Sequence, residues 1–375
     1  MPPVRIHPLF DYLLKTTEAA PEAFVGFSLS RSPRLRDFLA DLDPDLPLDW
    51  NGTSFQGLPA LRAHVLEQAG LTSACHPDDV LITAGAAEAN YLVMRQLLSP
   101  GDHIVTETPG WPQVAVLADA IGATLTAVQR REEDRWHLDP DAIARAMTPA
   151  TKLIFLTNPN NPTGQIIPPE DLTRIASIAD STGAWLLVDE VYAGLEWSAP
   201  RAPSVAGLIP RGITTGSVSK ALGLQGLRTG WIICRDATLI RDALILRENA
   251  SEIMNILGEV IAEIALRPDR LAPALATARA EGRANLGILD RFIKGSSLTW
   301  VPPAAGLIGL ARLPPHISSD DLAHRLLAPP YRTFLLPGSV YGQPHHIRVG
   351  TGGGPAANLA EGLTRLATCL ADWPV

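Results

Sequence analysis

Short apolar runs alternate with segments of helical periodicity through the middle of this 375-residue chain, and this alternation constrains its fold most. Each run is continuously apolar, as is typical of strands buried in a parallel sheet. The order of runs and helical segments predicts βαβ units around a largely parallel sheet, which is an α/β fold. The predicted strands cover residues 80–83, 103–106, 152–156, 185–188 and 231–234.

The segments on either side of this region differ from it. Residues 1–45 are rich in Pro and Arg and are expected to be irregular, whereas the last part of the chain has its own predicted strands near 307–311 and 347–349. Helical spacing covers 171–181 and 239–265. We therefore predict a large domain over 46–285 and a smaller α+β domain built from 1–45 and 286–375. The Gly-rich stretch 350–354 is expected to be a turn after a strand.

Composition excludes several classes of protein. The formal net charge of −8 argues against a nucleic-acid partner, which would require a basic face. Cys75, Cys234 and Cys369 are far apart and form no CxxC pair, so we expect no metal site, no disulfide framework and a cytoplasmic location. The N-terminus has no signal-peptide pattern, and no apolar stretch reaches the roughly 20 residues of a membrane span.

Lys220 is the first candidate catalytic residue. The chain has few lysines, and this one lies in the sequence GSVSK, directly after a predicted strand. A lysine that forms a Schiff base needs a pKa lowered by burial or by neighbouring positive charge. Two hydroxyls, Ser217 and Ser219, precede it, and Arg228 follows in GLR, so a phosphate pocket can form around it.

Two further motifs follow predicted strands. Asp189 and Tyr192 belong to DEVY, which begins where the strand 185–188 ends. Asn161 belongs to NPNNPTG, directly after the strand 152–156. Ligands of open α/β sheets bind at the carboxyl ends of strands, so both motifs are expected at the same edge. A carboxylate and a phenol there can hold the ring nitrogen and ring oxygen of a heteroaromatic cofactor.

In this order and spacing, NPNNPTG, DEVY and SVSK with GLR downstream resemble the class I and II aminotransferases of fold type I. The resemblance covers the chain from about residue 55 to the C-terminus. It implies the aspartate-aminotransferase fold, pyridoxal 5′-phosphate as cofactor, and small-molecule amino-acid and 2-oxo-acid substrates between which the α-amino group moves. It also implies a homodimer with active sites at the subunit interface.

The resemblance implies a role for each motif residue. Lys220 is similar to the Schiff-base lysine, which also moves the proton between the substrate Cα and the cofactor C4′. Asp189 resembles the partner of the pyridine nitrogen, and Tyr192 and Asn161 resemble the groups that bind the ring oxygen. Asn161 is also expected to contact the substrate. The phosphate ligands are expected to be Ser217, Ser219 and Arg228.

Three further segments extend the resemblance. A run of small residues after the strand 80–83 opens a helix, so Ala86 and Ala87 are expected to offer backbone N–H groups to the phosphate. Trp111 lies where the family stacks an aromatic ring on the cofactor. Arg348, inside a predicted strand, resembles the clamp for the substrate α-carboxylate. The side-chain pocket is expected to be built by the N-terminal segment, including 27–31, by the loops around 50–55 and by the partner chain. Arg31 either meets an acidic substrate there or lies on the surface.

The chain departs from the family pattern upstream of Gly57. The family has a tyrosine four or five residues before this glycine, where Gly52 and Thr53 stand here. This departure, the segment 337–350 and the sequence GLQGLR resemble capreomycidine synthase and related cyclases, which act on arginine-derived amino acids. Elimination or cyclisation is therefore the alternative to transamination. A non-catalytic sensor is a further alternative, whereas a nucleotide-binding enzyme is excluded because the chain has neither GxxxxGK[ST] nor GxGxxG.

Overall fold

The computed structural model describes residues 3–17, 19–49, 54–197, 199–352 and 356–374. Its largest sheet has the strand order β2-β8-β7-β6-β5-β3-β4. The α/β fold class predicted from the sequence is confirmed. The strands are β2 (Val80–Thr83), β3 (His103–Thr108), β4 (Thr124–Gln129), β5 (Thr151–Thr157), β6 (Trp185–Asp189), β7 (Gly212–Ser217) and β8 (Gly230–Ile233).

The direction of β8 corrects one prediction. The strands from β7 to β4 in this order are parallel, but β8 is antiparallel to both β2 and β7, so the prediction of a parallel strand at 231–234 was wrong. A continuous apolar run indicates burial on both faces, but it does not set the direction of the strand. The connection 218–229 contains only a short 3-10 turn, Gln225–Leu227, whereas a parallel return needs a crossover, usually a helix. With β8 reversed, β2 and β7 end at the same edge of the sheet.

Helices cover both faces of this sheet, because successive strand residues point in opposite directions. In β5, Leu153 and Phe155 pack with α3, α4 and α7, whereas Ile154 and Leu156 pack with α5 and α6. At the β2 end, Val80 and Ile82 pack with α2 and α8. The helices are α2 (Pro59–Ala69), α3 (Ala86–Leu97), α4 (Gln113–Ile121), α5 (Pro140–Ala146), α6 (Pro169–Thr182), α7 (Ala237–Glu248) and α8 (Ile256–Leu266).

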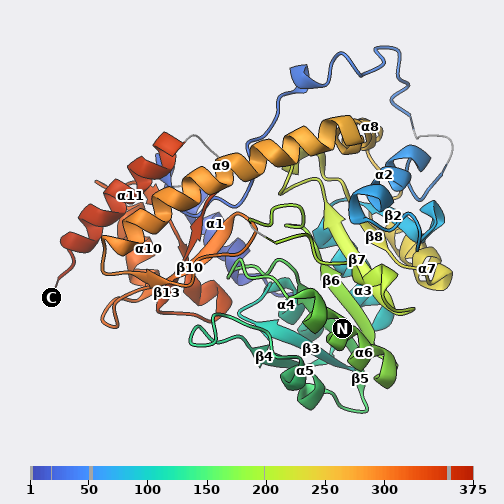
Figure 1. The fold of residues 1–375 in the computed structure, drawn as a ribbon, viewed down its shortest axis with the longest axis horizontal. Coiled ribbons are helices and arrows are strands. Elements are labelled where there is room, and N and C mark those ends of the chain that lie inside the picture. The colour runs from blue at the N-terminus through green and yellow to red at the C-terminus, as the bar shows by residue number, and fades with distance from the viewer. Residues whose placement is uncertain (1–2, 18, 50–53, 198, 353–355, 375) are drawn as a thin grey trace.

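The segment 239–265 is two helices, so the prediction of uninterrupted helical spacing was wrong there. The polar stretch between α7 and α8 ends at Asn255, whose side chain accepts a hydrogen bond from the Gly258 amide and so starts a new helix. The long helix α9 (Pro268–Lys294) then carries the chain from the large sheet to the C-terminal elements (Figure 1). The predicted domain boundary at 285 lies inside α9.

The C-terminal part contains a second sheet, of order β12-β13-β10-β9 and antiparallel throughout. Its elements are β9 (Thr299–Trp300), β10 (Ile308–Arg312), α10 (Ser319–Leu327), β12 (Leu336–Pro337), β13 (His346–Gly350) and α11 (Ala356–Ala371). The Gly-rich stretch does follow strand β13, but 353–355 lie outside the described residues.

The N-terminal segment joins this C-terminal part. Its strand β1 (Ala23–Phe24) pairs in parallel with β11 (Thr333–Phe334). A helix, α1 (Pro8–Thr17), precedes β1, so the expectation of an irregular N-terminal segment was wrong.

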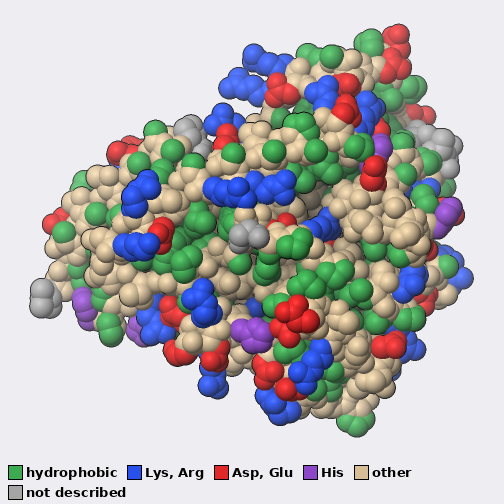
Figure 2. Space-filling view, in the orientation of Figure 1, with side chains coloured by type: hydrophobic (Ala, Val, Ile, Leu, Met, Phe, Trp, Pro, Cys, Tyr) green, Lys and Arg blue, Asp and Glu red, His purple; other side chains and the backbone are tan. Residues whose placement is uncertain are grey.

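The charges on one face of the molecule are mixed in sign. On the face shown in Figure 2, Lys and Arg side chains are interspersed with Asp and Glu and do not merge into one continuous basic surface. Within the described ranges, no helix is both long enough and apolar enough to cross a membrane. The same ranges contain no group of three or more His, Cys, Asp or Glu side chains placed to hold a metal ion.

Candidate active site

A cavity of about 550 Å³ lies at the edge of the large sheet where β2, β5, β6 and β7 end. The sequence motifs meet there because their parallel strands end at the same edge. Every site residue predicted from the sequence lines this cavity: Ala86, Ala87, Trp111, Asn161, Asp189, Tyr192, Ser217, Ser219, Lys220, Arg228 and Arg348.

The Lys220 amine is prepared to act as a neutral base or nucleophile. Burial lowers its pKa to about 8, because the ammonium loses water, and the positive charges of Arg348 and Arg228 act in the same direction while Asp189 opposes them. Its Nζ lies 5.9 Å from the centre of the Tyr192 ring. The amine has no hydrogen-bond partner among the described residues, so it is available to a ligand.

Asp189 ends β6 and is only 4% exposed. Its Oδ1 accepts from the Val191 amide at 3.0 Å and its Oδ2 accepts from Asn90 Nδ2 at 2.8 Å. Burial nevertheless raises its pKa to about 6, since desolvation outweighs these two hydrogen bonds. A ligand that brings a positively charged N–H group to this carboxylate would restore its charged form.

Asn90 is a site residue that the sequence analysis missed. It lies on the buried face of α3, where its Oδ1 accepts a 2.7 Å hydrogen bond from Thr215 Oγ1 and its amide donates to Asp189. Both ends of the side chain are therefore fixed, and Asn90 holds the carboxylate in one orientation. The available signal was a polar residue among the apolar positions of a helix, since buried polar groups need partners.

An anion site lies beside Lys220. Helix α3 begins at Ala86 without a side-chain cap, so its first N–H groups are open to a ligand. Arg228 Nη2 donates to the Ala84 carbonyl at 2.9 Å, which holds the guanidinium next to this helix start. A Cβ on Gly85 would lie 2.5 Å from that same Nη2, so glycine is needed for the approach.

Three hydroxyls complete this side of the cavity. Ser217 and Ser219 are buried at the end of β7, and Ser217 Oγ accepts from the Ser219 amide at 3.3 Å. The Tyr192 hydroxyl is buried without a hydrogen bond in the described part of the chain. Burial raises the pKa of Tyr192, although Arg348 and Ser28 are close enough to oppose the shift. Because buried polar groups need partners, this hydroxyl can donate a hydrogen bond to an acceptor on a ligand.

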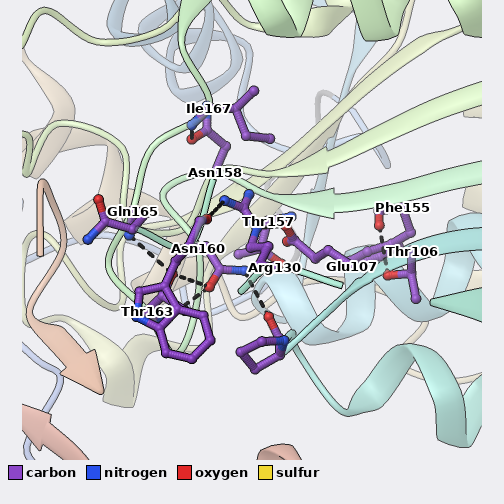
Figure 3. Close-up of polar contacts among 12 residues, drawn as sticks. Thr106, Glu107, Arg130, Phe155, Thr157, Asn158, Asn160, Thr163, Gln165 and Ile167 are labelled. Atoms are coloured by element: carbon purple, nitrogen blue, oxygen red, sulfur yellow. Dashed lines mark hydrogen bonds and ion pairs between the residues drawn. The ribbon is translucent and has the colours of Figure 1, made fainter. Parts of the chain in front are cut away.

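The loop after β5 is stabilised by hydrogen bonds from its own residues (Figure 3). Asn158 Oδ1 accepts from the Ile167 amide at 2.9 Å, and Asn160 Oδ1 accepts from the amide and hydroxyl of Thr163. These two asparagines therefore fix the loop itself. Asn161 instead faces the cavity, where its Oδ1 lies 3.5 Å from Arg348 Nη1.

A buried ion pair supports this loop at the end of β5, where the loop begins (Figure 3). Arg130 Nε donates to Glu107 Oε2 at 2.7 Å, and Glu107 Oε1 accepts from the Thr157 amide at 2.8 Å, directly before the loop. Arg130 also donates to the Trp136 carbonyl at 2.8 Å. The pair thus connects β3 to the end of β5.

We expect Arg130→Ala to lower the free energy of unfolding by about 3–5 kcal/mol, because Glu107 would be left charged and unpaired in the core. The free energy would be measured by urea denaturation followed by circular dichroism. Arg145→Ala, which removes an exposed pair with Asp139, is the matched control and should cost at most about 1 kcal/mol. Equal effects of the two substitutions would contradict the assignment.

Arg348 is a buried cation without a buried anion. It is 7% exposed, and its guanidinium donates to Tyr341 Oη at 2.8 Å and to the Gly26 carbonyl at 3.0 Å. Its Nε has no hydrogen-bond partner, and no carboxylate of the described residues pairs with it. A buried charge is costly without a counter-ion, so a ligand carboxylate fits this place.

Trp111 and α1 close the cavity. Trp111 is half-buried, its Nε1 donates to Gln113 Oε1 at 3.0 Å, and its ring lies 5.0 Å from that of His7. The N-terminal segment, which was expected to help build the side-chain pocket, does line the cavity through Leu9 and Leu13 of α1 and Phe24 of β1. The apolar pair Leu9 and Leu13 at helical spacing was a signal for α1 itself, which was not predicted.

These features fit pyridoxal phosphate. The open helix start with Arg228 suits a phosphate, the Asp189 carboxylate suits a protonated ring nitrogen, and the unpartnered Tyr192 hydroxyl suits the ring oxygen. The Lys220 amine, with its lowered pKa, suits the aldehyde carbon. Fold and site together define a pyridoxal-phosphate-dependent enzyme of the aspartate-aminotransferase fold.

Comparison with known proteins gives the family. Residues 51–366 match the model of the family described as aminotransferase class I and II. The chain belongs to this family, whose members depend on pyridoxal phosphate. A solved structure of a PLP-dependent aminotransferase from Streptococcus suis superposes with a TM-score of 0.90 and 25% identity, covering 99% of both chains.

Two curated relatives are a synthase and a transaminase. Capreomycidine synthase from Streptomyces vinaceus is 30% identical over 291 residues, which cover 77% of this chain and 73% of that protein. Arginine–pyruvate transaminase from Pseudomonas aeruginosa is 27% identical over 328 residues, which cover 84% and 81%. Gly52 and Thr53, where the family tyrosine is missing, lie outside the described residues.

We expect the Lys220 amine to react with an acylating reagent at a rate that rises through about pH 8. Burial lowers its pKa, so above pH 8 this amine is neutral while an ordinary lysine amine, with a pKa of about 10.4, remains protonated. The measurement is brief acetylation of the apoenzyme at several pH values, with peptide mass spectrometry. The peptides of Lys15, Lys152 and Lys294 serve as internal references, and a Lys220 profile that coincides with theirs would contradict the shift.

Proposed function

We propose that this enzyme moves the α-amino group of an amino acid to a 2-oxo acid. The observation that carries the proposal is the pairing of a lysine of lowered pKa with a buried arginine that has no carboxylate partner among the described residues. The arginine would bind the α-carboxylate of either substrate, and the lysine would act on the neighbouring Cα. Membership of the aminotransferase family supports this reaction.

In this proposal, Arg348 holds the substrate carboxylate, and the neutral Lys220 Nζ takes the proton from the substrate Cα. Bound pyridoxal phosphate supplies an electron sink for the negative charge that develops at Cα. Asp189, oriented by Asn90, keeps the ring nitrogen protonated, and Tyr192 and Asn161 donate hydrogen bonds to the ring oxygen. Asp189 would thus influence the reaction indirectly, because its carboxylate keeps the proton on the ring nitrogen.

The phosphate would be held by the remaining residues of the set. Ala86 and Ala87 would offer backbone N–H groups, Ser217 and Ser219 hydroxyl groups, and Arg228 its guanidinium. Trp111 would cover the ring face. All of these residues lie on the large sheet or on segments that it positions, so the cofactor would be bound rigidly.

The experiment adds a panel of amino acids to the holoenzyme without an oxo acid and records the cofactor spectrum and the product masses together. Conversion to the pyridoxamine form with a 2-oxo-acid product would support transamination. The second candidate, elimination or cyclisation, is favoured by the 30% identity to capreomycidine synthase. A product that keeps its amine and loses water would establish that candidate and overturn transamination.

We also propose a homodimer with active sites at the subunit interface. Residues 35–48, between β1 and α2, run along the outside of the molecule (Figure 1), and they expose Leu35, Leu39 and Leu48 to solvent. Exposed apolar side chains on one segment favour burial against a partner. Sedimentation equilibrium that gives twice the chain mass would support the proposal, and a single-chain mass would overturn it.

A reducing, cytoplasmic location is proposed as well. Cys75, Cys234 and Cys369 are all free thiols, and Cys234 and Cys369 are buried. Burial raises the pKa of Cys234 to about 12, so this thiol is chemically inert. Cell fractionation with an antibody to the chain would test the location, and recovery outside the cytoplasmic fraction would contradict it.

A further inference from the structure

The part of the cavity not assigned to the cofactor or to Arg348 is lined mainly by apolar side chains. They come from four segments of the smaller domain: helix α1, strand β1 with the loop after it, β11 and β12. The side chains are those of Leu9, Leu13, Phe24, Phe27, Phe334 and Leu336. We call these six residues the apolar wall.

Contacts on both sides hold the wall in place. Phe24 lies edge-on to Phe27 at 5.3 Å and 5.9 Å from Phe334, measured between ring centres. Tyr12 Oη donates to the Leu335 carbonyl at 2.6 Å, which ties α1 to the strands behind it. His7, directly before α1, contacts the Trp111 ring. Helix α1 therefore joins the wall to the predicted cofactor site.

The charged side chains that line the described cavity already have roles. They are Asp189, Lys220, Arg228 and Arg348. The single carboxylate, Asp189, accepts hydrogen bonds at both oxygens from Asn90 and Val191. Among the described residues of one chain, a substrate guanidinium or ammonium would thus lose water without meeting a free carboxylate, which is costly.

A second substrate carboxylate would also lack a partner in the described cavity. Arg31, the sequence candidate for that role, does not line the cavity, and its Nη2 lies 3.0 Å from Glu281 Oε1 on the surface. Of the two possibilities open for Arg31, the structure therefore supports the surface position.

We propose that this pocket accepts amino acids with apolar side chains, aliphatic or aromatic, and rejects arginine-derived and dicarboxylic ones. The inference rests on the proposed function, since it places the substrate carboxylate on Arg348. With the carboxylate there, the side chain extends toward the apolar wall and loses water on contact with it. The arginine in the name of the Pseudomonas aeruginosa transaminase then does not carry over to this chain.

The first test measures kcat/KM of the holoenzyme for leucine, methionine and phenylalanine against arginine, lysine and aspartate, with one oxo-acid acceptor throughout. The apolar donors should exceed the charged donors by at least about 100-fold, since an unpaired charge in an apolar pocket costs more than one missing methylene. Arginine or aspartate as the best donor would overturn the proposal.

A matched pair of variants tests the wall itself. Leu13 lines the cavity and is 38% exposed, whereas its neighbour Leu14 does not line it and is 50% exposed. Leu13→Glu should lower kcat/KM for leucine by at least about 10-fold and raise the arginine-to-leucine ratio, because it adds a carboxylate to the wall. Leu14→Glu should change neither value. Equal effects of both substitutions would argue against the wall as the specificity site.

Carboxylates that lack the α-amino group cannot react, so their binding measures the side-chain preference of the pocket independently of the reaction. Calorimetry on the holoenzyme should give tighter binding of isocaproate than of guanidinobutyrate or succinate, by about 10-fold or more. This order does not depend on which reaction follows. If no amino acid gave a 2-oxo acid, the proposed transamination would fail, and the binding order would still decide the side-chain preference. Tighter binding of guanidinobutyrate or succinate would overturn the inference even if transamination were observed.

Discussion

Lys220→Ala is expected to lower kcat by about 10⁴-fold, because the variant loses the amine that attaches the cofactor and the base that takes the Cα proton. The wild-type amine is favoured for both tasks, since burial lowers its pKa to about 8. About one-tenth of it is then neutral at pH 7, a far larger fraction than for an ordinary lysine with a pKa of about 10.4. The measurement is single-turnover conversion of a fast donor, followed by the cofactor spectrum.

Lys152→Ala provides the control. Lys152 lies on β5 and is exposed, so its loss should leave kcat within about twofold. A second readout does not depend on turnover: borohydride reduction of the holoenzyme should attach the cofactor mass to the Lys220 peptide and to no other lysine peptide. A Lys220→Ala protein with full turnover, or label on Lys152, would refute the assignment.

The sequence predicts the site better than it predicts the architecture around it. Asn161, Asp189 and Ser217 follow three neighbouring parallel strands, so their meeting point follows from strand order alone. Their motifs are also local, because each lies within a few residues of the strand end that positions it. The structure places these three residues around one cavity for this reason, whereas Arg348 reaches the same cavity from β13 of the second sheet.

The missed features depend on distant contacts. The direction of β8 is set by the lack of a crossover helix after Lys220, not by its own apolar residues. Asn90 becomes a site residue only because Thr215 and Asp189 lie on its two sides. Helix α1 is held against the cavity by the hydrogen bond from Tyr12 to the Leu335 carbonyl, which is 323 residues away along the chain. The contact between His7 and Trp111, also distant in sequence, holds the start of the helix. Local periodicity carries no information about such partners.

Arg348→Ala is expected to lower kcat/KM by about 100- to 1,000-fold, mainly through a higher KM, because the substrate carboxylate loses a charged bidentate partner. Arg348→Lys should restore only part of this loss, since a lysine ammonium cannot reproduce the planar fork of a guanidinium. Steady-state kinetics over a wide range of donor concentration would separate KM from kcat.

The same substitution should lower the free energy of unfolding by less than Arg130→Ala does, and this contrast separates a substrate clamp from a structural residue. Arg348 pairs with no carboxylate in the described chain, so its removal takes a donor only from neutral groups: the Gly26 carbonyl, the Tyr341 and Ser28 hydroxyls and the Asn161 amide oxygen. The expected cost is about 1–3 kcal/mol. Arg312→Ala, on the adjacent strand β10, removes an exposed pair with Glu132 and should leave kcat/KM unchanged. A loss of several kcal/mol in Arg348→Ala would instead make the guanidinium a structural residue. A buried cation that does not stabilise the fold is explained by the anion it binds during turnover.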